Sequence, residues 1–429
     1  MGQLTLPPTG VQEVGSHEKT TRLSSLTRFP IFESLQFPDF RWVWLGSFAS
    51  FMAMNMQMIT RGWLVLRLAD DSPLALSLVM VAFAFPLTFV SLLGGALADR
   101  IPRKSMIMLS QGGNAIMTLL LATLDITGLI EFWHLLAIGV VNGSMFAFNM
   151  PSRQALISEI VPVNRLMNAI SLNNSGMNLA RAIGPAVAGV LIIYLDTAGV
   201  FYLITGFYIF SVLSVSMINT GVTPASSSRK SVTGDIREGL SYAFGNPTLL
   251  GLIIMAFIPV LFGFSYFALL PAWAREALDV HSDGLGMLMM TMGIGALIGS
   301  LILASMCNFK RRGALLLVNS VSWGVALAIF SQTTSYQMTL PFLMLVGLLS
   351  SVFMSLNMTL MQIYATPEMR GRMMSIIMMT FGVMPLSALP FGAIAERIGT
   401  PNALGLSGLM LAGFTIIFAV GYPRFRRIA

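Results

Sequence analysis

Apolar residues in this chain form long unbroken runs that are separated by short polar segments. An α-helix needs about 20 apolar residues to cross the hydrocarbon core of a bilayer, and the runs match that length. They are continuous, whereas the strands of a membrane β-barrel alternate apolar and polar residues. The pattern therefore predicts twelve membrane-spanning helices, over residues 42–66, 74–98, 104–124, 132–150, 166–194, 199–218, 248–272, 284–307, 313–331, 338–362, 373–395 and 402–422.

The composition agrees with a chain whose solvent is lipid. Of its 429 residues, 55% are hydrophobic and only 10% are charged, whereas a soluble domain carries about 25% charged residues. So few charges cannot cover the surface of a water-soluble domain. Residues 1–41 contain no apolar segment of signal-peptide length, so we expect no cleavage there. The aromatic residues of 30–44 favour a position at the membrane interface, just before the first helix.

Basic residues are concentrated in the connections on one side of the predicted membrane. With the N-terminus in the cytoplasm, 20 of the 25 Lys and Arg residues fall on the cytoplasmic side. This bias is the positive-inside signature, and it predicts that both termini are cytoplasmic. Topology explains the net charge of +7, so we expect no nucleic-acid partner.

The longest polar connection divides the predicted helices into six plus six. The two halves repeat weakly at an offset of 205 residues, which pairs Pro162 with Pro367 and Pro185 with Pro390. Parallel six-helix repeats are typical of transporters. The expected organisation is a cytoplasmic N-terminal segment (1–41), an N-terminal bundle (42–218), a cytoplasmic central loop (219–247), a C-terminal bundle (248–422) and a cytoplasmic tail (423–429).

Three groups of residues resemble the major facilitator superfamily. The run "GGALADRIPRK" (94–104) is similar to the family signature between helices two and three, with Pro102 where glycine is common. The run "ARAIGPAVAG" (180–189) resembles the family element on helix five. The runs at 60–79 and 150–162 resemble the branch that contains bacterial siderophore (enterobactin) and macrolide exporters. The resemblance implies an all-α integral membrane fold of two pseudo-symmetric six-helix bundles.

The resemblance implies mechanical roles for the first two runs. Asp99 can approach the positive N-terminus of helix eleven near Met373 when the halves close, and so bias a rocking motion between two states. The basic residues of the run can instead serve only to enforce topology. The helix-five residues are expected to form a hinge or, equally, to allow close packing without motion. The expected gating residues are Gly95, Asp99, Arg100, Arg103 and Lys104, and those of the hinge are Gly184, Pro185 and Gly189.

Polar side chains at membrane depth are costly, so each is a candidate for function. In the family, helices one, four, seven and ten line a central cavity. Arg181 stays charged at any accessible pH and needs water, an acceptor or an anion. The asparagines can instead be interhelical hydrogen-bonding groups, and Arg181 can bond carbonyls freed by Pro185. The candidate substrate-binding residues are Asn55, Gln57, Asn142, Asn174, Asn178, Arg181, Tyr266 and Asn357.

A proton pathway is not evident in the sequence. Every carboxylate falls at the end of a predicted span or in a connection, and Gly139 stands where the family's proton antiporters carry an arginine. If protons are coupled, Glu131 and His134 at the outer end of helix four are the candidates, with Asp99. No ATP-binding motif is present, and Cys307 is the single cysteine, so we expect no cofactor and no metal site. The 32 methionines suit an adaptable apolar surface better than a copper site.

These observations predict a secondary transporter that works by alternating access. The resemblance implies export of a small amphipathic or anionic organic solute, drug- or siderophore-like, from a bacterial cytoplasmic membrane. We expect a monomer embedded in the bilayer, and coupling to protons stays open. Two further hypotheses are a lipid or lysophospholipid translocator and a non-transporting receptor or assembly partner. An enzyme is not expected, because no nucleophile–base pair lies at membrane depth.

Overall fold

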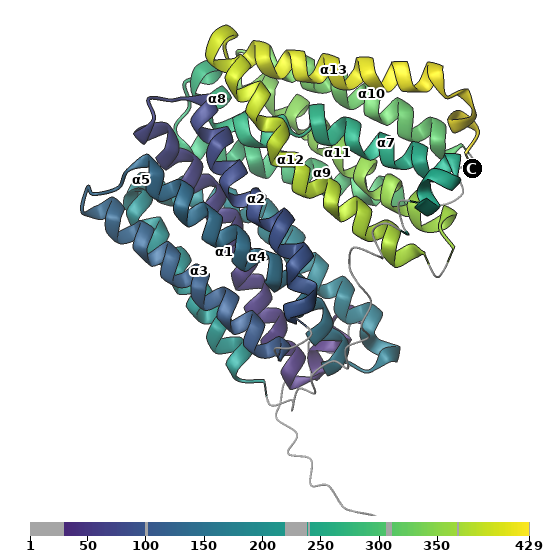
Figure 1. Ribbon diagram of the computed structural model, residues 1–429. Helices are drawn as coiled ribbons and strands as arrows, with labels where there is room; N and C mark the ends of the chain where they lie inside the picture. The colour runs from purple at the N-terminus through teal and green to yellow at the C-terminus, as the bar shows by residue number, and fades with distance from the viewer. Residues whose placement is uncertain are drawn as a thin grey trace, which may run out of the picture.

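The computed structural model describes residues 30–98, 102–218, 238, 241–305, 311–366 and 369–428, and these are almost entirely helical (Figure 1). The elements are η2 (Pro30–Gln36), α1 (Pro38–Leu68), α2 (Pro73–Ala98), α3 (Arg103–Ile126), α4 (Phe132–Ile160), α5 (Val163–Ser216), α7 (Pro247–Phe262), α8 (Ser265–Leu278), α9 (Ser282–Ser305), α10 (Arg312–Ser331), α11 (Tyr336–Tyr364), α12 (Arg370–Ile398), α13 (Thr400–Gly421) and η3 (Pro423–Arg427).

Two features reconcile these elements with the predicted spans. Helix α5 contains the fifth and sixth spans, which meet at Asp196, where the backbone is non-helical (φ 54°, ψ 177°). Helices α7 and α8 together form the seventh span, and Pro259 near the end of α7 cannot donate a backbone hydrogen bond. With these two adjustments the described residues contain a helix at each of the twelve predicted spans, and the predicted fold class is confirmed.

The fourth helix is longer than the sequence pattern predicts. The apolar run ends near residue 150, but α4 continues to Ile160. The pattern therefore assigns Arg153 to a connection, whereas this residue lies inside α4 with only 2% of its surface exposed. The pattern misses this extension because polar residues interrupt the apolar run, although Ser152 and Arg153 among them are buried in the structure.

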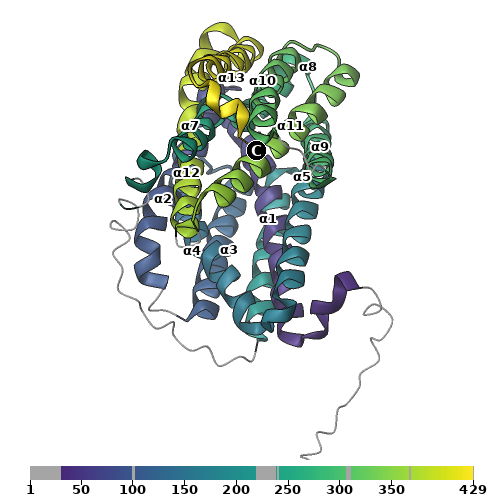
Figure 2. The same ribbon diagram turned by 90° about the vertical axis from the view of Figure 1, so that its right-hand side faces the viewer.

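The helices pack as two bundles that touch along two seams. In the N-terminal half, α1 and α3 pack on α5, and α2 packs on α4. In the C-terminal half, α10 packs on α13, and α9 packs on α11. The seams between the halves are α2 against α12 and α5 against α9, which Figure 2 shows on opposite sides of the molecule.

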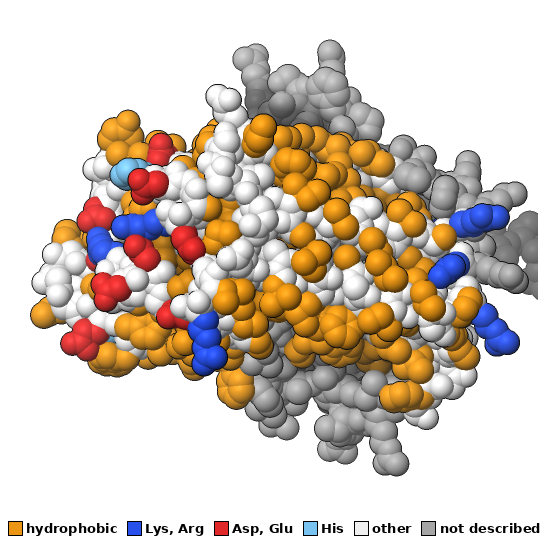
Figure 3. All heavy atoms as spheres, turned by 90° about the horizontal axis from the view of Figure 1, so that it is seen from above, with side chains coloured by type: hydrophobic (Ala, Val, Ile, Leu, Met, Phe, Trp, Pro, Cys, Tyr) orange, Lys and Arg blue, Asp and Glu red, His pale blue; other side chains and the backbone are white. Residues whose placement is uncertain are grey.

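The outer surface fits a lipid environment. Eight helical segments among the described residues are long and apolar enough to cross a membrane by length and composition. Figure 3 shows an apolar belt between two charged ends on the face that it presents. At the left end acidic and basic side chains are mixed, and at the right end, where the C-terminus lies in Figure 1, the coloured charges are basic. Large apolar side chains such as Leu301 are exposed on the helices, as expected of a surface that faces lipid.

We call the end that carries Pro30 and Ile428, the first and last described residues, the terminal end, and the opposite end the far end. At the far end, Asp71 Oδ1 lies 3.1 Å from Arg275 Nε, which joins α8 to the loop before α2. Glu396 of α12 accepts hydrogen bonds from the Ser72 hydroxyl and, at 3.4 Å, from the Leu74 N–H. Figure 1 shows that the bundles meet near α2 and α8 and diverge toward the terminal end. The far end is therefore the closed end.

Candidate functional site

A cavity of about 340 Å³ lies inside the N-terminal half, and part of its wall comes from the other half. Its volume is within the range of small-molecule sites, about 300–1,000 Å³. Helices α1 to α4 supply most of the lining, and Phe267, Pro271 and Met289 of α8 and α9 close it from the C-terminal half. The polar lining residues are Ser50, Asn55, Gln57, Arg61, Gln111, Asn114, Asn142, Asn149 and Tyr208.

Arg61 is the cation of this cavity. It lies on α1 and is 8% exposed. One of its terminal nitrogens donates to Asn142 Oδ1 over 2.7 Å, and Asn142 Nδ2 donates to Asn114 Oδ1 over 2.8 Å. This chain ties α1, α4 and α3 together. The Asn142 amide turns its oxygen toward the cation, so it holds the guanidinium in place without neutralising its charge.

A second hydrogen-bonded chain fixes the wall beside Arg61. The Tyr208 hydroxyl donates to Gln57 Oε1 over 2.9 Å, and Gln57 Nε2 donates to Thr118 Oγ1 over 3.3 Å. The three residues come from α5, α1 and α3. Since each polar group has a partner in another helix, Gln57 serves as an interhelical bridge as well as a lining residue.

A buried arginine lies behind the wall, nearer the terminal end. Arg153 Nε donates to Asn149 Oδ1 over 3.3 Å, and another nitrogen donates to the Ser47 hydroxyl. Asn149 Nδ2 donates to Ser110 Oγ over 2.8 Å. The guanidinium carbon of Arg153 lies 5.8 Å from the centre of the Phe51 ring, which adds a cation–π contact. These neutral partners hold a second positive charge at membrane depth.

The structure brings three of the predicted substrate-binding residues together in the cavity. Asn55, Gln57 and Asn142 all line it. Asn55 Nδ2 also donates to Phe51 O of its own helix over 2.8 Å, which leaves its Oδ1 as the free acceptor of this amide. Asn142 holds Arg61. The sequence therefore located part of this wall.

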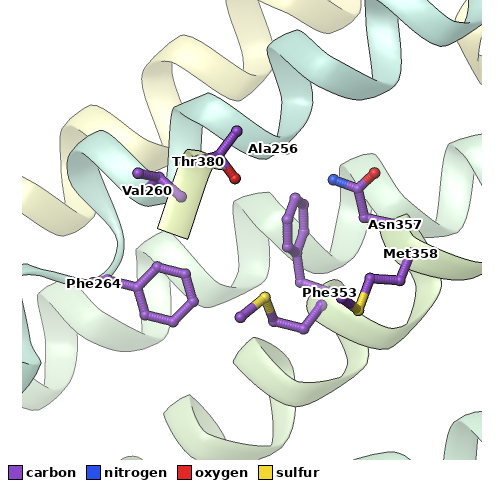
Figure 4. Close-up of a pocket in the computed structure, with 8 residues that line it drawn as sticks. Ala256, Val260, Phe264, Phe353, Asn357, Met358 and Thr380 are labelled. Atoms are coloured by element: carbon purple, nitrogen blue, oxygen red, sulfur yellow. The ribbon is translucent and has the colours of Figure 1, made fainter. Parts of the chain in front are cut away.

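The other five predicted residues lie elsewhere. On α5, Asn174 and Arg181 are exposed and Asn178 is partly buried, outside the lining of the cavity. Tyr266 is fully buried on α8, in the other half. Asn357 lines a separate cavity of about 10 Å³ between α7, α11 and α12, together with Phe264 and Thr380 (Figure 4).

Sequence reasoning misses Arg61 and Arg153 as site residues. Arg61 falls inside the first predicted span, but hydropathy alone does not show that it faces a cavity. For Arg153 a signal is present, because Asn142, Asn149 and Arg153 are separated by seven and four residues. That spacing places three polar residues on one face of a helix. A polar stripe of this kind indicates that the helix continues and faces a polar interior.

The described part of the gating motif makes contacts within the N-terminal half. Arg103 pairs with Glu159 at the end of α4 and donates to Ala155 O over 3.4 Å. Lys104 Nζ donates to Ser216 O over 2.8 Å and to Ile218 O over 2.7 Å, which satisfies carbonyls at the end of α5. Gly95 lies in the last part of α2. Asp99 and Arg100 lie outside the described residues, so their gating role stays a prediction.

The predicted hinge residues form close contacts in this conformation. A Cβ atom at Gly189 would lie 2.3 Å from Ser282 O of α9, and Ser282 Oγ donates to Gly189 O over 2.9 Å. A Cβ at Gly184 would lie 2.9 Å from Asn55 Cβ, and one at Gly286 would lie 2.7 Å from Pro185 O. Gly184 therefore allows α5 to approach α1, and Gly189 allows it to approach α9. Close packing at both glycines is what the structure shows.

Glu131 and His134, the weak candidates for proton coupling, form a helix cap. His134 Nδ1 accepts from the Glu131 N–H over 3.0 Å, and the Glu131 side chain accepts from the N–H of His134. The Trp133 indole donates to Glu131 Oε2 over 2.7 Å. This reciprocal arrangement satisfies the first turn of α4 at the far end.

Solved structures share this fold. A bacterial homolog of the human lysosomal transporter Spinster, in an inward-facing and unoccupied conformation, superposes with a TM-score of 0.72 at 13% identity. The match covers 92% of this chain and 98% of that one. At this identity the likeness shows the fold alone. It is a multi-pass membrane transporter fold of two six-helix bundles.

The sequence comparisons assign the family. The model of the transmembrane secretion effector family, within the major facilitator superfamily, matches residues 31–427. The chain belongs to this family of transporters. The predicted resemblance is confirmed, and membership of a transporter family agrees with the prediction that the chain is not an enzyme.

Relatives with assigned transport roles align along most of the chain. The staphyloferrin A transporter of Staphylococcus aureus is 24% identical over 87% of this chain and 94% of its own length. The multidrug efflux pump Tap of Mycolicibacterium fortuitum is 25% identical over 85% of this chain and 91% of its own length. The enterobactin exporter EntS of Shigella flexneri is 26% identical over 91% and 94%. The chain is thus a secondary transporter whose substrates are small molecules, embedded in a membrane.

Proposed function

We propose that this chain exports a small amphipathic organic solute, drug- or siderophore-like, across a bacterial cytoplasmic membrane. The observation that carries the proposal is a solute-sized cavity in the N-terminal half, with part of its wall from α8 and α9 of the other half. The two bundles are closed at the far end and diverge at the terminal end. Solute enters from the terminal end and leaves after the far-end contacts open. The related efflux pump and exporter support this direction.

The orientation in the membrane is part of the proposal. We place the terminal end, and hence both termini, in the cytoplasm. The concentration of Lys and Arg in the connections of that end supports this placement. Figure 3 agrees on the face that it presents. In this orientation the structure is the inward-open state. A monomer as the working unit is part of the proposal.

The cavity lining favours a solute with an apolar body and few polar groups. Much of its wall is made of methionine and aromatic side chains, and methionines adapt to solutes of different shape. These apolar lining residues include Met54, Met58, Met80, Phe83, Phe146, Phe267 and Met289. The polar groups described above face the same space. Proton coupling stays a proposal, with Glu131 and His134 as candidates and Asp99, which lies outside the described residues, as a third.

We expect the Asp71→Asn, Glu396→Gln double variant to open the far end more often. Both contacts are exposed, with side chains of Asp71 and Arg275 48% and 42% exposed, and such pairs contribute about 0–1 kcal/mol each. The open population should therefore rise a few-fold. Spin labels at Thr127→Cys and Thr334→Cys, with Cys307→Ser, measure the far-end distance. The matched control is the charge swap Asp71→Arg, Arg275→Asp, which keeps an ion pair at this place and leaves Glu396 unchanged. It should show the wild-type distribution of far-end distances. Unchanged distances in the double variant would contradict the closing role.

A further inference from the structure

We infer that the solute is an organic anion whose acidic group binds Arg61. This inference rests on the proposed function and narrows its substrate class. It starts from charge: Arg61 and Arg153 are both buried in the N-terminal half. Neither forms an ion pair with any residue that the structure describes. A guanidinium does not lose its proton at physiological pH, so it cannot escape the cost of burial by neutralising.

An unpartnered donor belongs to the arginine that lines the cavity. Arg61 Nε has no hydrogen-bond partner among the described residues, while a terminal nitrogen of the same group is held by Asn142. A guanidinium has five N–H donors in a planar fork that matches a carboxylate. Arg61 lines the cavity, whereas Arg153 lies behind the wall and is held by Asn149 and Ser47. Arg61 is therefore the anchor, and Arg153 adds to the positive potential.

The other lining residues determine the chemistry of the solute beyond its acidic group. The carboxylates of Asp71 and Asp125 are engaged at the far end, with Arg275 and Arg67. No described residue that lines the cavity is acidic, so nothing there favours a cation. Met54, Phe83 and Phe146 offer apolar surface to the body of the solute. One acidic group on an aromatic or aliphatic body is the chemistry that this wall accommodates.

The second observation is a buried acceptor on a residue of the same cavity wall. Gln111 lines the cavity, and its Oε1 has no hydrogen-bond partner among the described residues, because its amide nitrogen is the group that donates to Ser50 over 2.7 Å. A buried acceptor without a donor is costly. A hydroxyl on the solute would satisfy it while the acidic group binds Arg61. The site thus selects hydroxylated organic acids over their simple counterparts.

The test compares an acid with its neutral amide in the purified protein in nanodiscs. The probes are naphthoate, hydroxynaphthoate and naphthamide at millimolar concentration, and the readout is the shift in melting temperature, which reports the affinity for the folded state. We expect both acids to stabilise the wild type, hydroxynaphthoate more than naphthoate, and naphthamide to have no comparable effect. Arg61→Gln should weaken acid binding at least about tenfold, since charge-assisted hydrogen bonds are lost.

A second variant guards against misfolding of the first. Asn142→Asp keeps the size of the side chain and places a carboxylate on Arg61, so it supplies the missing anion internally. We expect a stable protein that no longer binds the acids. Arg424→Gln removes an exposed positive charge near the C-terminus and should bind like wild type.

Each contrary outcome is distinct. Equal stabilisation by the amide, or no stabilisation by either acid, would overturn the assignment of an organic anion. Stabilisation by chloride alone, with no further effect of the acids, would show that an inorganic anion occupies Arg61 and would also overturn it. These assays measure binding without flux, so their failure leaves the proposed export to be judged by transport. Conversely, a protein that binds the acids but moves no solute contradicts the proposed function alone.

Discussion

Replacing Gly189 by leucine is expected to lower transport about 10- to 100-fold while the protein still inserts in the membrane. A side chain at this position meets the backbone oxygen of Ser282 on α9, and backbone cannot move aside as a flexible side chain can. Overpacking of this kind costs about 1–3 kcal/mol. The cost falls on the state in which the far end is closed, because Gly189 and Ser282 are in contact across the two halves there.

The matched control is Gly206→Leu in the sixth span, which is also part of α5. A Cβ at Gly206 meets nothing within 4 Å, so transport should be unchanged. The Thr127 and Thr334 spin labels should report a longer far-end distance in the Gly189 variant and the wild-type distance in the Gly206 variant. Full transport by Gly189→Leu would show that close approach of α5 and α9 is not required.

Replacing Asn149 by leucine is expected to destabilise the folded protein by about 2–3 kcal/mol. The change removes the acceptor of Arg153 Nε and the donor to Ser110 Oγ. Hydrogen bonds to charged groups contribute about 1.5–3 kcal/mol, and a buried charge without partners is costly. Because Arg153 is 2% exposed, water cannot replace the lost contact. The measurement is the loss of folded protein on heating in detergent micelles.

Asn402→Leu is the control for that experiment. Asn402 is exposed at the far end, and its amide donates only to Ile398 O of the preceding turn, over 2.7 Å. Surface substitutions of this kind change the free energy of unfolding by less than about 0.5 kcal/mol. If Asn149→Leu melts at the wild-type temperature, Arg153 does not depend on this neutral cluster and finds another partner.

The sequence was sufficient for most of the fold because lipid imposes a simple rule on it. Every span must be a helix with an apolar surface, so runs of apolar residues locate the helices directly. The rule fails where buried polar residues extend a helix, as Ser152 and Arg153 do in α4 beyond residue 150. Arg153 is bonded to Asn149 inside the protein. Hydropathy registers only that Arg153 is polar and therefore assigns it to a connection.

The site was harder to predict because the depth of a residue in the membrane does not determine the direction in which its side chain points. Asn55 and Arg181 both lie within spans, but Asn55 lines the cavity and Arg181 is exposed outside its lining. Which way a side chain points depends on how the helices pack, and one sequence does not fix that. Arg61 illustrates the same limit. Its charge is visible in the run 42–66, but its enclosure by Asn142 and Asn114 requires the fold.

Closure at one end and a solute-sized cavity with a buried cation fit the proposed alternating-access cycle. The far-end contacts of Asp71 and Glu396 are exposed and weak, so they can be broken within a transport cycle. The network around Arg61 is buried and is formed within one half. It can therefore move as a rigid body with its bundle while the opposite bundle rocks.

The measurement that tests export most directly is solute uptake into inside-out membrane vesicles, in which the cytoplasmic side faces the medium. Vesicles with the wild-type chain should accumulate hydroxylated aromatic acids when energised, and vesicles with equal amounts of Gly189→Leu should accumulate far less. Running the assay with and without a proton gradient tests the coupling. Equal uptake by wild-type and Gly189→Leu vesicles, or uptake only in right-side-out vesicles, would contradict export through this cavity.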